Sequence, residues 1–323
     1  MKTKILAGII LLAIGIVSFY VGMSSYHEGE STSTPTPLAP IITNTPTPTV
    51  TPIPTQTPTP TLTPTPTPIS IPTDGLKHVI DKSLEGTTGV YGVVVINFQT
   101  GERYAVNEHR VFVSASLYKL WVMATAFDEI QNGRLREDEL LHQSIAVLNR
   151  EFDISTRSAE LTEGTISLSV KNALEKMITI SHNYAALLLS ERVKLSTVRR
   201  FLVNYGFTES ALGEPTTTTA YDIALFFEKL YNGELADQEH TDKMTDLLKR
   251  QMLNNKLAKY LPLDLPVAHK TGEIDLYTHD AGITFGTNGD YVIAVLSESY
   301  FPPGAAQRIA DISKAVYDYF EGK

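Results

Sequence analysis

Residues 114–127, SASLYKLWVMATAF, form an apolar segment that opens with two serines and carries Lys119 three positions after Ser116. Apolar side chains on nearly every side of the segment predict a buried helix. Residues three positions apart share a helix face, so we expect the Lys119 amine to reach the Ser116 hydroxyl. Two interpretations follow: a serine that caps the helix beside a lysine that extends out of the core, or a nucleophile beside its base.

The position of this pair at the start of a helix supports the catalytic interpretation more strongly than the Ser-x-x-Lys motif does. With 21 serines and 16 lysines in the chain, about one Ser-x-x-Lys is expected by chance. At the start of a helix, however, free N–H groups and the helix dipole stabilise the negative charge that develops when a serine attacks a carbonyl. A buried lysine near another cation has a lowered pKa and can accept the proton. Ser116 and Lys119 are therefore a candidate nucleophile and base.

The patterns after residue 73 predict a sheet with a helical insert. Amphipathic helices are expected near both ends of this region, at residues 75–86 and 304–320. Between them, β-branched runs and turn signals predict five strands, at residues 90–98, 102–107, 267–273, 280–286 and 290–298. Residues 134–260 are mostly helical in pattern, with loops at 155–165 and 206–219. We therefore predict an α+β (α/β) fold in which an antiparallel five-stranded sheet is flanked by N- and C-terminal helices and joined to an all-helical lobe.

Composition narrows the class of protein. The formal net charge is −9, which argues against nucleic acid as a partner because phosphate binding needs a basic surface. Cysteine is absent, which excludes disulfides, thiol chemistry and thiolate metal sites. The eight histidines are scattered without metal-ligand spacing. We expect no metal and no cofactor.

The first 73 residues predict attachment to a membrane. Two lysines precede an uncharged apolar stretch from Ile5 to Met23, which is long enough to span a bilayer and is followed by no small-x-small cleavage site. We interpret residues 1–30 as a membrane anchor with a short flank, its N-terminus held inside by the lysines. Residues 31–73, with 13 of the 18 prolines, predict a disordered Pro/Thr-rich linker. Residues 74–323 would then form one domain on the extracytoplasmic side of the cell membrane.

Two further motifs follow the serine–lysine pair. Ser181 and Asn183 stand at the start of an apolar helical pattern, ITISHNYAALLL, and Lys270-Thr271-Gly272 lie in the strand VAHKTGE. Taken alone, Ser181 could be a helix N-cap and KTG the end of a strand. Chance is a poor explanation for the serine–lysine pair, the SHN motif and the KTG motif occurring in this order, the first two at predicted helix starts and the third on a predicted strand.

With these motifs in place, the chain from about residue 74 to its end resembles the penicillin-recognising serine enzymes, and among them the class A β-lactamases. The similarity is carried by TGERYAVNEHRVFVSASLYKL, by SHN where that family usually has Ser-Asp-Asn, by HKTGE, and by PTTTTAYDIALFFEKL. The resemblance implies the β-lactamase/transpeptidase-like fold and catalysis through an acyl-enzyme. It covers essentially the whole predicted globular part.

The resemblance implies that the catalytic residues are Ser116, Lys119, Ser181 and Lys270. Ser116 would attack a carbonyl and become acylated, and Lys119 would take its proton. Ser181, placed between Lys119 and Lys270, would relay a proton to the departing nitrogen.

Further residues would bind the substrate. Asn183 would hold the side-chain amide, while Lys270 and Thr271 would bind the carboxylate. Gly272 would leave the strand edge bare, so that a substrate could lie along it as an added strand. The backbone N–H groups of Glu273 and of the nucleophile would form the oxyanion hole.

Two positions depart from the family pattern. His182 replaces the usual aspartate, which we expect to alter local structure more than chemistry. The segment 207–219, FTESALGEPTTTT, lacks the Glu-x-x-Leu-Asn sequence whose glutamate activates the deacylating water in class A β-lactamases. We interpret Glu209 and Glu214 as ordinary loop charges, so deacylation of a β-lactam should be slow.

The sequence therefore predicts an anchored, monomeric serine hydrolase that acts on β-lactams, on D-Ala-D-Ala wall peptides (peptidoglycan stem peptides), or on both. One alternative is an efficient class A β-lactamase, and another is a non-catalytic wall-binding or β-lactam-sensing module. We expect His279 and Asp280 to be turn residues with ordinary hydrogen bonds, although a place beside the cleft is the alternative.

Overall fold

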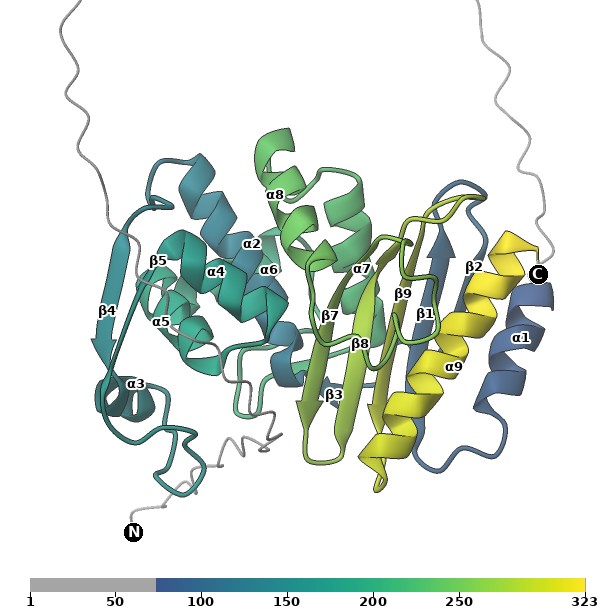
Figure 1. The fold of residues 1–323 in the computed structure, drawn as a ribbon, viewed down its shortest axis with the longest axis horizontal. Helices are drawn as coiled ribbons and strands as arrows, with labels where there is room; N and C mark the ends of the chain where they lie inside the picture. Colours follow the sequence, from purple (N-terminus) through teal and green to yellow (C-terminus); the bar gives the residue numbers. More distant parts are fainter. Residues whose placement is uncertain (1–73, 323) are drawn as a thin grey trace, which may run out of the picture. The chain divides into compact units, whose positions relative to one another are not determined.

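The structure is a computed structural model that describes residues 74–322. The predicted anchor (1–30) and linker (31–73) lie outside the described residues. A lobe of helices and a lobe built on a sheet lie side by side (Figure 1). Of the helices in residues 74–322, none is long and apolar enough to cross a membrane.

The sheet in the described part of the chain has five antiparallel strands in the order β2-β1-β9-β8-β7. The strands are β1 (Val90–Asn97), β2 (Arg103–Val106), β7 (Val267–Ile274), β8 (Tyr277–Thr284) and β9 (Tyr291–Glu298). Two strands that come early in the sequence thus lie beside three that come late. The predicted fold class is confirmed.

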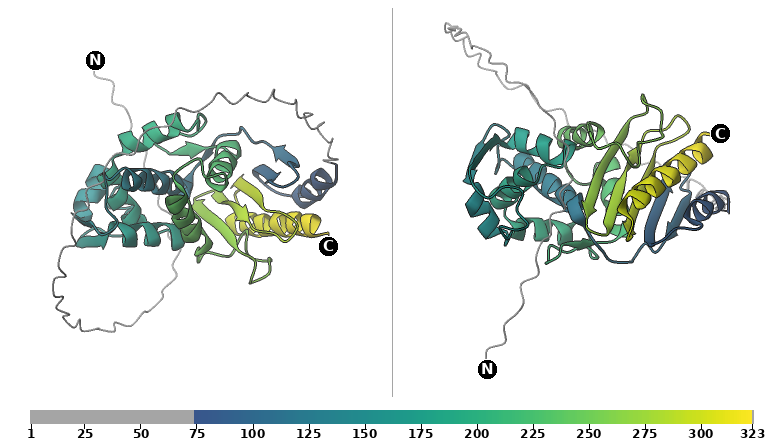
Figure 2. Two further views of the ribbon diagram at one scale, coloured as in Figure 1. Left: turned by 90° about the horizontal axis from the view of Figure 1, so that it is seen from above. Right: turned by 60° about the horizontal axis from the view of Figure 1, so that its bottom comes forward.

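Both faces of the central strands are buried. Because side chains alternate between the faces of a strand, Val93 and Val95 pack into one apolar cluster while Val94 packs into another. Helices α1 (Asp74–Leu84) and α9 (Pro302–Glu321) cover the first face (Figures 1 and 2). The helical lobe covers the second. Burial on both faces explains why β1 reads as a continuous apolar run instead of an alternating one.

Helix α2 (Tyr118–Gln131) is the centre of the helical lobe, and its apolar side chains are buried on all sides. It ends with Asn132 as its C-cap and is followed by Gly133, whose φ of +69° is typical of a residue just after a helix end. The helices that pack in the lobe with it are α3 (Ile145–Glu151), α4 (Val170–Thr179), α5 (Asn183–Val193), α6 (Leu195–Asn204), α7 (Ala220–Tyr231) and α8 (Gln238–Lys249). A helix that is apolar all round needs such a surrounding shell.

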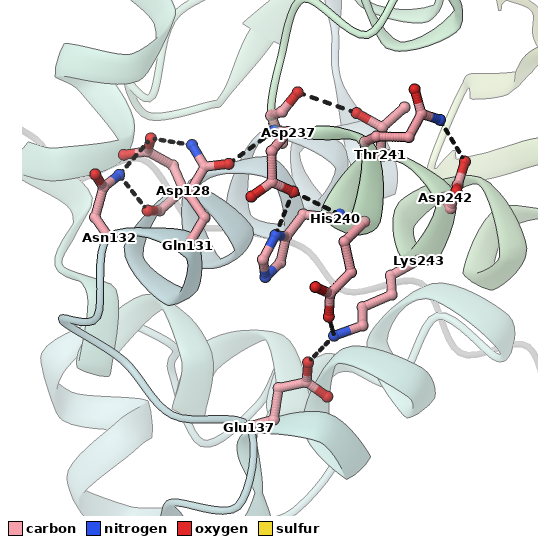
Figure 3. A network of polar contacts seen from close by, with 12 residues as sticks. Asp128, Gln131, Asn132, Glu137, Asp237, His240, Thr241, Asp242 and Lys243 are labelled. Carbon is pink, nitrogen blue, oxygen red and sulfur yellow. Dashed lines mark hydrogen bonds and ion pairs between the residues drawn. The ribbon is translucent and has the colours of Figure 1, made fainter. Parts of the chain in front are cut away.

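A polar network joins the start of α8 to the end of α2 (Figure 3). The Asp237 carboxylate accepts hydrogen bonds from the backbone N–H and the ring of His240, and its own N–H donates to Gln131 Oε1 at 2.9 Å. Lys243 pairs with Glu137 at 2.6 Å. Helix α8 also contacts β7, so this network helps to hold the edge of the sheet against the helical lobe.

Two short ribbons add strands that the sequence did not predict, three of them within residues 134–260, which were predicted to be mostly helical. Strand β4 (Leu140–Ser144) pairs with β5 (Thr165–Ser169), and β3 (Phe112–Val113) pairs with β6 (Thr217–Thr218). Strands β3 and β6 have two residues each, which is too short for a period-two pattern to show. The second ribbon brings the threonine-rich segment beside the residues that precede Ser116.

Candidate active site

Ser116 lies in a short 3-10 turn, η1 (Ala115–Leu117), directly before α2. The turn is fixed on two sides. The Ser114 N–H donates to Thr216 O at 2.8 Å, and His279 Nε2 donates to Val113 O at 2.8 Å. The Ser116 side chain is partly exposed, and its hydroxyl has no hydrogen-bond partner within residues 74–322. The hydroxyl is therefore positioned by the backbone and left open to a ligand.

The backbone around this turn is strained and closely packed. Ala115 has φ +46°, a region that is costly for a residue with a Cβ and that tends to occur at functional sites. Gly272 of β7 faces the turn: a Cβ there would lie 3.2 Å from Ser114 O and 3.3 Å from Ser116 N. Gly272 therefore allows the strand to approach the nucleophile turn, a reason for glycine that the sequence did not reveal. Glu273 follows it, so the two predicted oxyanion-hole donors come from facing segments.

Lys119 is completely buried in the first turn of α2. Its Nζ donates to Ser181 O at 2.6 Å, to Ser181 Oγ at 3.1 Å and to Asn183 Oδ1 at 2.6 Å. The expected hydrogen bond between Lys119 and Ser116 is not formed, because the Lys119 amine is directed at Ser181 and Asn183. The structure therefore joins Lys119 to the SHN motif.

Ser181 lies between two lysine amines. Its Oγ is 3.1 Å from Lys119 Nζ and 3.0 Å from Lys270 Nζ, and Lys270 also donates to Thr271 O at 2.8 Å. Ser181 is not a helix N-cap: His182 is, and its ring accepts a hydrogen bond from Ala185 N at 3.2 Å. With φ +56°, Ser181 is held in an unusual conformation that has no capping purpose.

Burial makes both lysines weak bases. Desolvation lowers the pKa of Lys119 well below its usual value, the charge of Lys270 lowers it further, and the charge of Glu160 opposes these effects. Desolvation also lowers the pKa of Lys270 to about 7, with the charge of Asp280 acting in the opposite direction. A neutral Lys119 amine can donate to Ser181 O and Asn183 Oδ1 and still offer its lone pair to a proton. The arrangement can thus move a proton along Lys119, Ser181 and Lys270.

The KTG strand contributes the predicted binding residues. Lys270 and Thr271 are buried on β7, whereas the Glu273 side chain is 55% exposed. Lys256, which the sequence analysis missed, pairs with Glu273 at 2.5 Å although its own side chain is only 2% exposed. Its charge also contributes to lowering the pKa of Lys270. No motif marks Lys256, because a lysine in a polar loop resembles any other surface lysine.

Glu160 is a second residue that sequence reasoning missed. It belongs to the loop between α3 and β5, and its Oε1 accepts a hydrogen bond from Asn183 Nδ2. The Asn183 side chain therefore connects Lys119, through its oxygen, to Glu160, through its nitrogen. The only available signal was the general tendency of loops to carry function.

The expectation that His279 and Asp280 are turn residues is wrong. Both are buried in β8, because the strand begins at Tyr277 and not at residue 280. Burial lowers the pKa of His279 to about 4. Its Nδ1 accepts from Ser297 N at 3.1 Å while its Nε2 donates to Val113 O, which fits a neutral ring. The role of His279 is to fix the strand before the nucleophile turn.

Neither acid of the segment 207–219 contacts the candidate catalytic residues. Glu209 accepts from Thr219 Oγ1 at 2.8 Å and pairs with His109 at 2.8 Å. Glu214 is exposed and has no hydrogen-bond partner within the described chain. The segment instead touches the nucleophile turn through Thr216, whose Oγ1 accepts from Ser114 Oγ at 2.7 Å.

A serine on a strained turn, two buried lysines that share a hydroxyl, and a sheet joined to a helical lobe define the class of penicillin-recognising serine hydrolases. The family model described as the β-lactamase enzyme family matches residues 75–320, and the chain belongs to that family. It is a serine hydrolase of the β-lactamase and penicillin-binding type. No curated protein sequence matches the chain.

Solved structures show the same fold at low sequence identity. A structure described as PBP-A has 22% identity and a TM-score of 0.67, and the match covers 78% of this chain and 97% of PBP-A. A β-lactamase from Sphaerobacter thermophilus has 23% identity and a TM-score of 0.69, with 78% and 99% covered. The TLA-3 extended-spectrum β-lactamase has 24% identity and a TM-score of 0.68, with 76% and 98% covered. The predicted fold and family are confirmed, whereas the roles of the individual site residues stay predictions.

Proposed function

We propose that this protein is a serine acyl-transfer enzyme that accepts β-lactams or acyl-D-Ala-D-Ala wall peptides and that releases the acyl group of a β-lactam slowly. One observation carries the proposal. The Ser181 hydroxyl lies 3.1 Å and 3.0 Å from two buried lysine amines, beside the turn that presents Ser116. A hydroxyl in that position can pass a proton from a base to a leaving group.

The acylation step follows from these positions. The Ser116 oxygen forms a bond to the substrate carbonyl carbon, and its proton passes to the neutral Lys119 amine. The N–H groups of Ser116 and Glu273 stabilise the oxyanion, an arrangement worth about 3–4 kcal/mol per donor. When the bond from carbon to nitrogen breaks, Ser181 gives its proton to the nitrogen and recovers one from Lys119. In the free protein the amine of Lys119 faces Ser181, so a small movement toward Ser116 accompanies substrate binding.

Binding uses the two sides of the site. On β7, protonated Lys270 and the Thr271 hydroxyl hold the substrate carboxylate, and Lys256 adds positive charge nearby. On the helical lobe, Asn183 Nδ2 donates to the carbonyl of the side-chain amide. The substrate backbone lies along β7, which is one of the two edge strands in the sheet order of the described residues.

Slow release is supported by the segment 207–219. Glu209 is held by His109 and Thr219, and Glu214 faces solvent, so neither carboxylate is placed to activate water beside Ser116. A missing general base typically costs about 10²–10⁴-fold in rate. The acyl-enzyme formed with a β-lactam should therefore accumulate.

The proposed location rests on the sequence of the first 73 residues. An apolar anchor followed by a Pro/Thr-rich linker would hold the domain outside the cytoplasm, where wall peptides are found. At about 3.1 Å per residue, an extended linker of this length could reach roughly 130 Å from the membrane.

The test is to incubate the full-length protein with penicillin and follow its mass. We expect a penicilloyl adduct that persists for minutes or longer, and a burst followed by a slow steady state with a chromogenic β-lactam. Ser116→Ala should abolish the adduct, while Ser83→Ala, a serine on α1 across the sheet, should leave it unchanged. An unchanged thermal unfolding midpoint would show that Ser116→Ala still folds.

Two results would support other functions. Rapid turnover without an adduct would make the protein an efficient β-lactamase, and a glutamine at position 209 or 214 would then reveal which acid serves as the base. An adduct that is undiminished in Ser116→Ala would remove Ser116 as the nucleophile. If neither adduct nor turnover occurs with any β-lactam or D-Ala-D-Ala peptide, a binding or sensing module is the better interpretation.

A further inference from the structure

Glu160 places a carboxylate at the substrate side of the candidate active site. Its Oε1 accepts a hydrogen bond from Asn183 Nδ2, and Asn183 Oδ1 accepts one from Lys119 Nζ at 2.6 Å. The Glu160 side chain is exposed, and it forms no ion pair within residues 74–322. In the free protein this carboxylate therefore occupies the donor of Asn183 that a substrate amide would use.

The charge of Glu160 is not neutralised by its neighbours. Burial lowers the pKa of Lys119 and so disfavours its charged form, and its amine donates to Ser181 O and Asn183 Oδ1 and not to Glu160. Burial also lowers the pKa of the nearby His182, which keeps that ring neutral. Lys256 is paired with Glu273, and Lys270 donates to Ser181 Oγ and Thr271 O. The mouth of the site beside Asn183 is therefore negative.

A substrate must replace Glu160 at Asn183. When the substrate carbonyl accepts the hydrogen bond from Asn183 Nδ2, the Glu160 carboxylate loses its partner and faces the group attached next to that amide. A positive group there restores an ionic contact, whereas a negative group meets a like charge.

We propose that Glu160 is a specificity-determining residue that favours acyl donors with a positive charge on the carbon next to the side-chain amide and disfavours donors with a negative charge there. This proposal rests on the proposed acyl-transfer function. It identifies the preferred substrates as cationic β-lactams or wall peptides with a free amino group at that position.

Three penicillins test the proposal, because they differ only in the substituent at this carbon: ampicillin carries an amino group, benzylpenicillin a hydrogen and carbenicillin a carboxylate. The second-order acylation rate of the full-length protein is measured by mass at about pH 6.5, where an α-amino group is protonated. We expect ampicillin to react faster than benzylpenicillin, and carbenicillin slower, each by roughly 2–5-fold, as for partly exposed charge pairs.

Glu160→Gln keeps an oxygen that accepts from Asn183 but removes the charge, so the three rates should converge to within about 2-fold. Glu163→Gln is the matched control, because Glu163 is an exposed acid of the same loop with no hydrogen-bond partner among the described residues. It removes the same charge and should preserve the order of the three rates.

Different failures are distinguishable. Equal rates for the three penicillins in the wild type overturn the selection by charge while the acyl-transfer function stands. An equal loss for all three in Glu160→Gln shows that Glu160 only orients Asn183, and it also overturns the proposal. The absence of a Ser116-dependent adduct with every penicillin overturns both the function and this inference.

Discussion

At the scale of single residues, the proposed chemistry depends on which of two buried lysines carries a proton. Lys119 and Lys270 both lie within 3.1 Å of the Ser181 hydroxyl. Burial destabilises the charged form of each, and a charge on one opposes a charge on the other. Burial and the charge of Lys270 favour the neutral form of Lys119, which can act as a base, whereas Lys270, with its pKa lowered to about 7, is partly protonated near neutral pH and can bind a carboxylate.

A neutral Lys119 beside a protonated Lys270 predicts a bell-shaped pH dependence of the acylation rate. As the pH falls, Lys119 becomes protonated and can no longer accept the proton of Ser116, so the rate decreases. As the pH rises above about 7, Lys270 loses its proton and its attraction for the substrate carboxylate, so the rate decreases again. Stopped-flow measurement of acylation by a chromogenic β-lactam from about pH 5 to about pH 10 provides the test.

Lys270→Arg is the control for the alkaline limb. Arginine stays protonated over this range, so the decrease above about pH 7 should disappear while the acidic limb remains. If the alkaline limb is the same in Lys270→Arg, then another group causes it and the carboxylate-binding role of Lys270 is wrong.

The residues that the sequence identified are those whose motifs are local. Ser116 with Lys119, and Lys270 with its two successors, were visible because the members of each motif lie within a few positions of one another in the sequence. Glu160 and Lys256 were not, because each gains its place only when a loop is folded against Asn183 or Glu273. The contact of Lys119 with Ser181 was equally hidden, since 62 positions separate the two residues.

At the scale of elements, β8 must pass very close to β7. A Cβ on Gly282 would lie 2.3 Å from Ala268 O and 2.5 Å from the Cβ of His269, far inside normal contact. Both atoms belong to the strand that carries Lys270. The glycine therefore sets the separation of the two strands and, through it, the position of the candidate active-site lysine.

Gly282→Ala should reduce the free energy of unfolding by about 1–3 kcal/mol, as for overpacked cores, and should also slow acylation because β7 must shift. Gly213→Ala is the control: its Cβ would lie 3.5 Å from Pro215 O, an ordinary contact. Both changes affect the unfolded chain alike, so only Gly282→Ala should be destabilising. Urea unfolding of the two variants measures the difference, and equal midpoints would contradict the close approach.

The elements that the sequence predicted have strong patterns. Strands β1, β8 and β9 combine β-branched residues with clear turn signals, and α2 is apolar all round. The ribbon formed by β3 and β6 has two residues in each strand, so it depends on pairing that local sequence does not encode. The sequence also missed the start of β8 at Tyr277, because the first residues of this strand are polar and only the neighbouring strands bury them.

At the scale of the whole molecule, the anchor and linker predicted for residues 1–73 stay a prediction. The full-length protein should fractionate with membranes and should resist extraction by high salt. Protease added outside intact cells should cut the chain in residues 31–73 and release a fragment that retains penicillin labelling. Recovery of a soluble form beginning shortly after Met23 would show instead that the apolar segment is a cleaved signal.

The pairing of β1 with β9 has a consequence for the synthesis of the chain. Their partners run from Val90 with Glu298 to Asn97 with Tyr291, which are 208 and 194 positions apart. At about 5–20 residues per second, β1 leaves the ribosome roughly 10–40 s before its partner strand exists. The helices of the helical lobe can form during that interval, but the five-stranded sheet cannot be completed. A newly made chain must therefore keep the apolar run VYGVVVIN in an unfolded and aggregation-prone state until translation is almost finished. A late-closing sheet of this kind is compatible with transfer of the chain across a membrane before the domain folds.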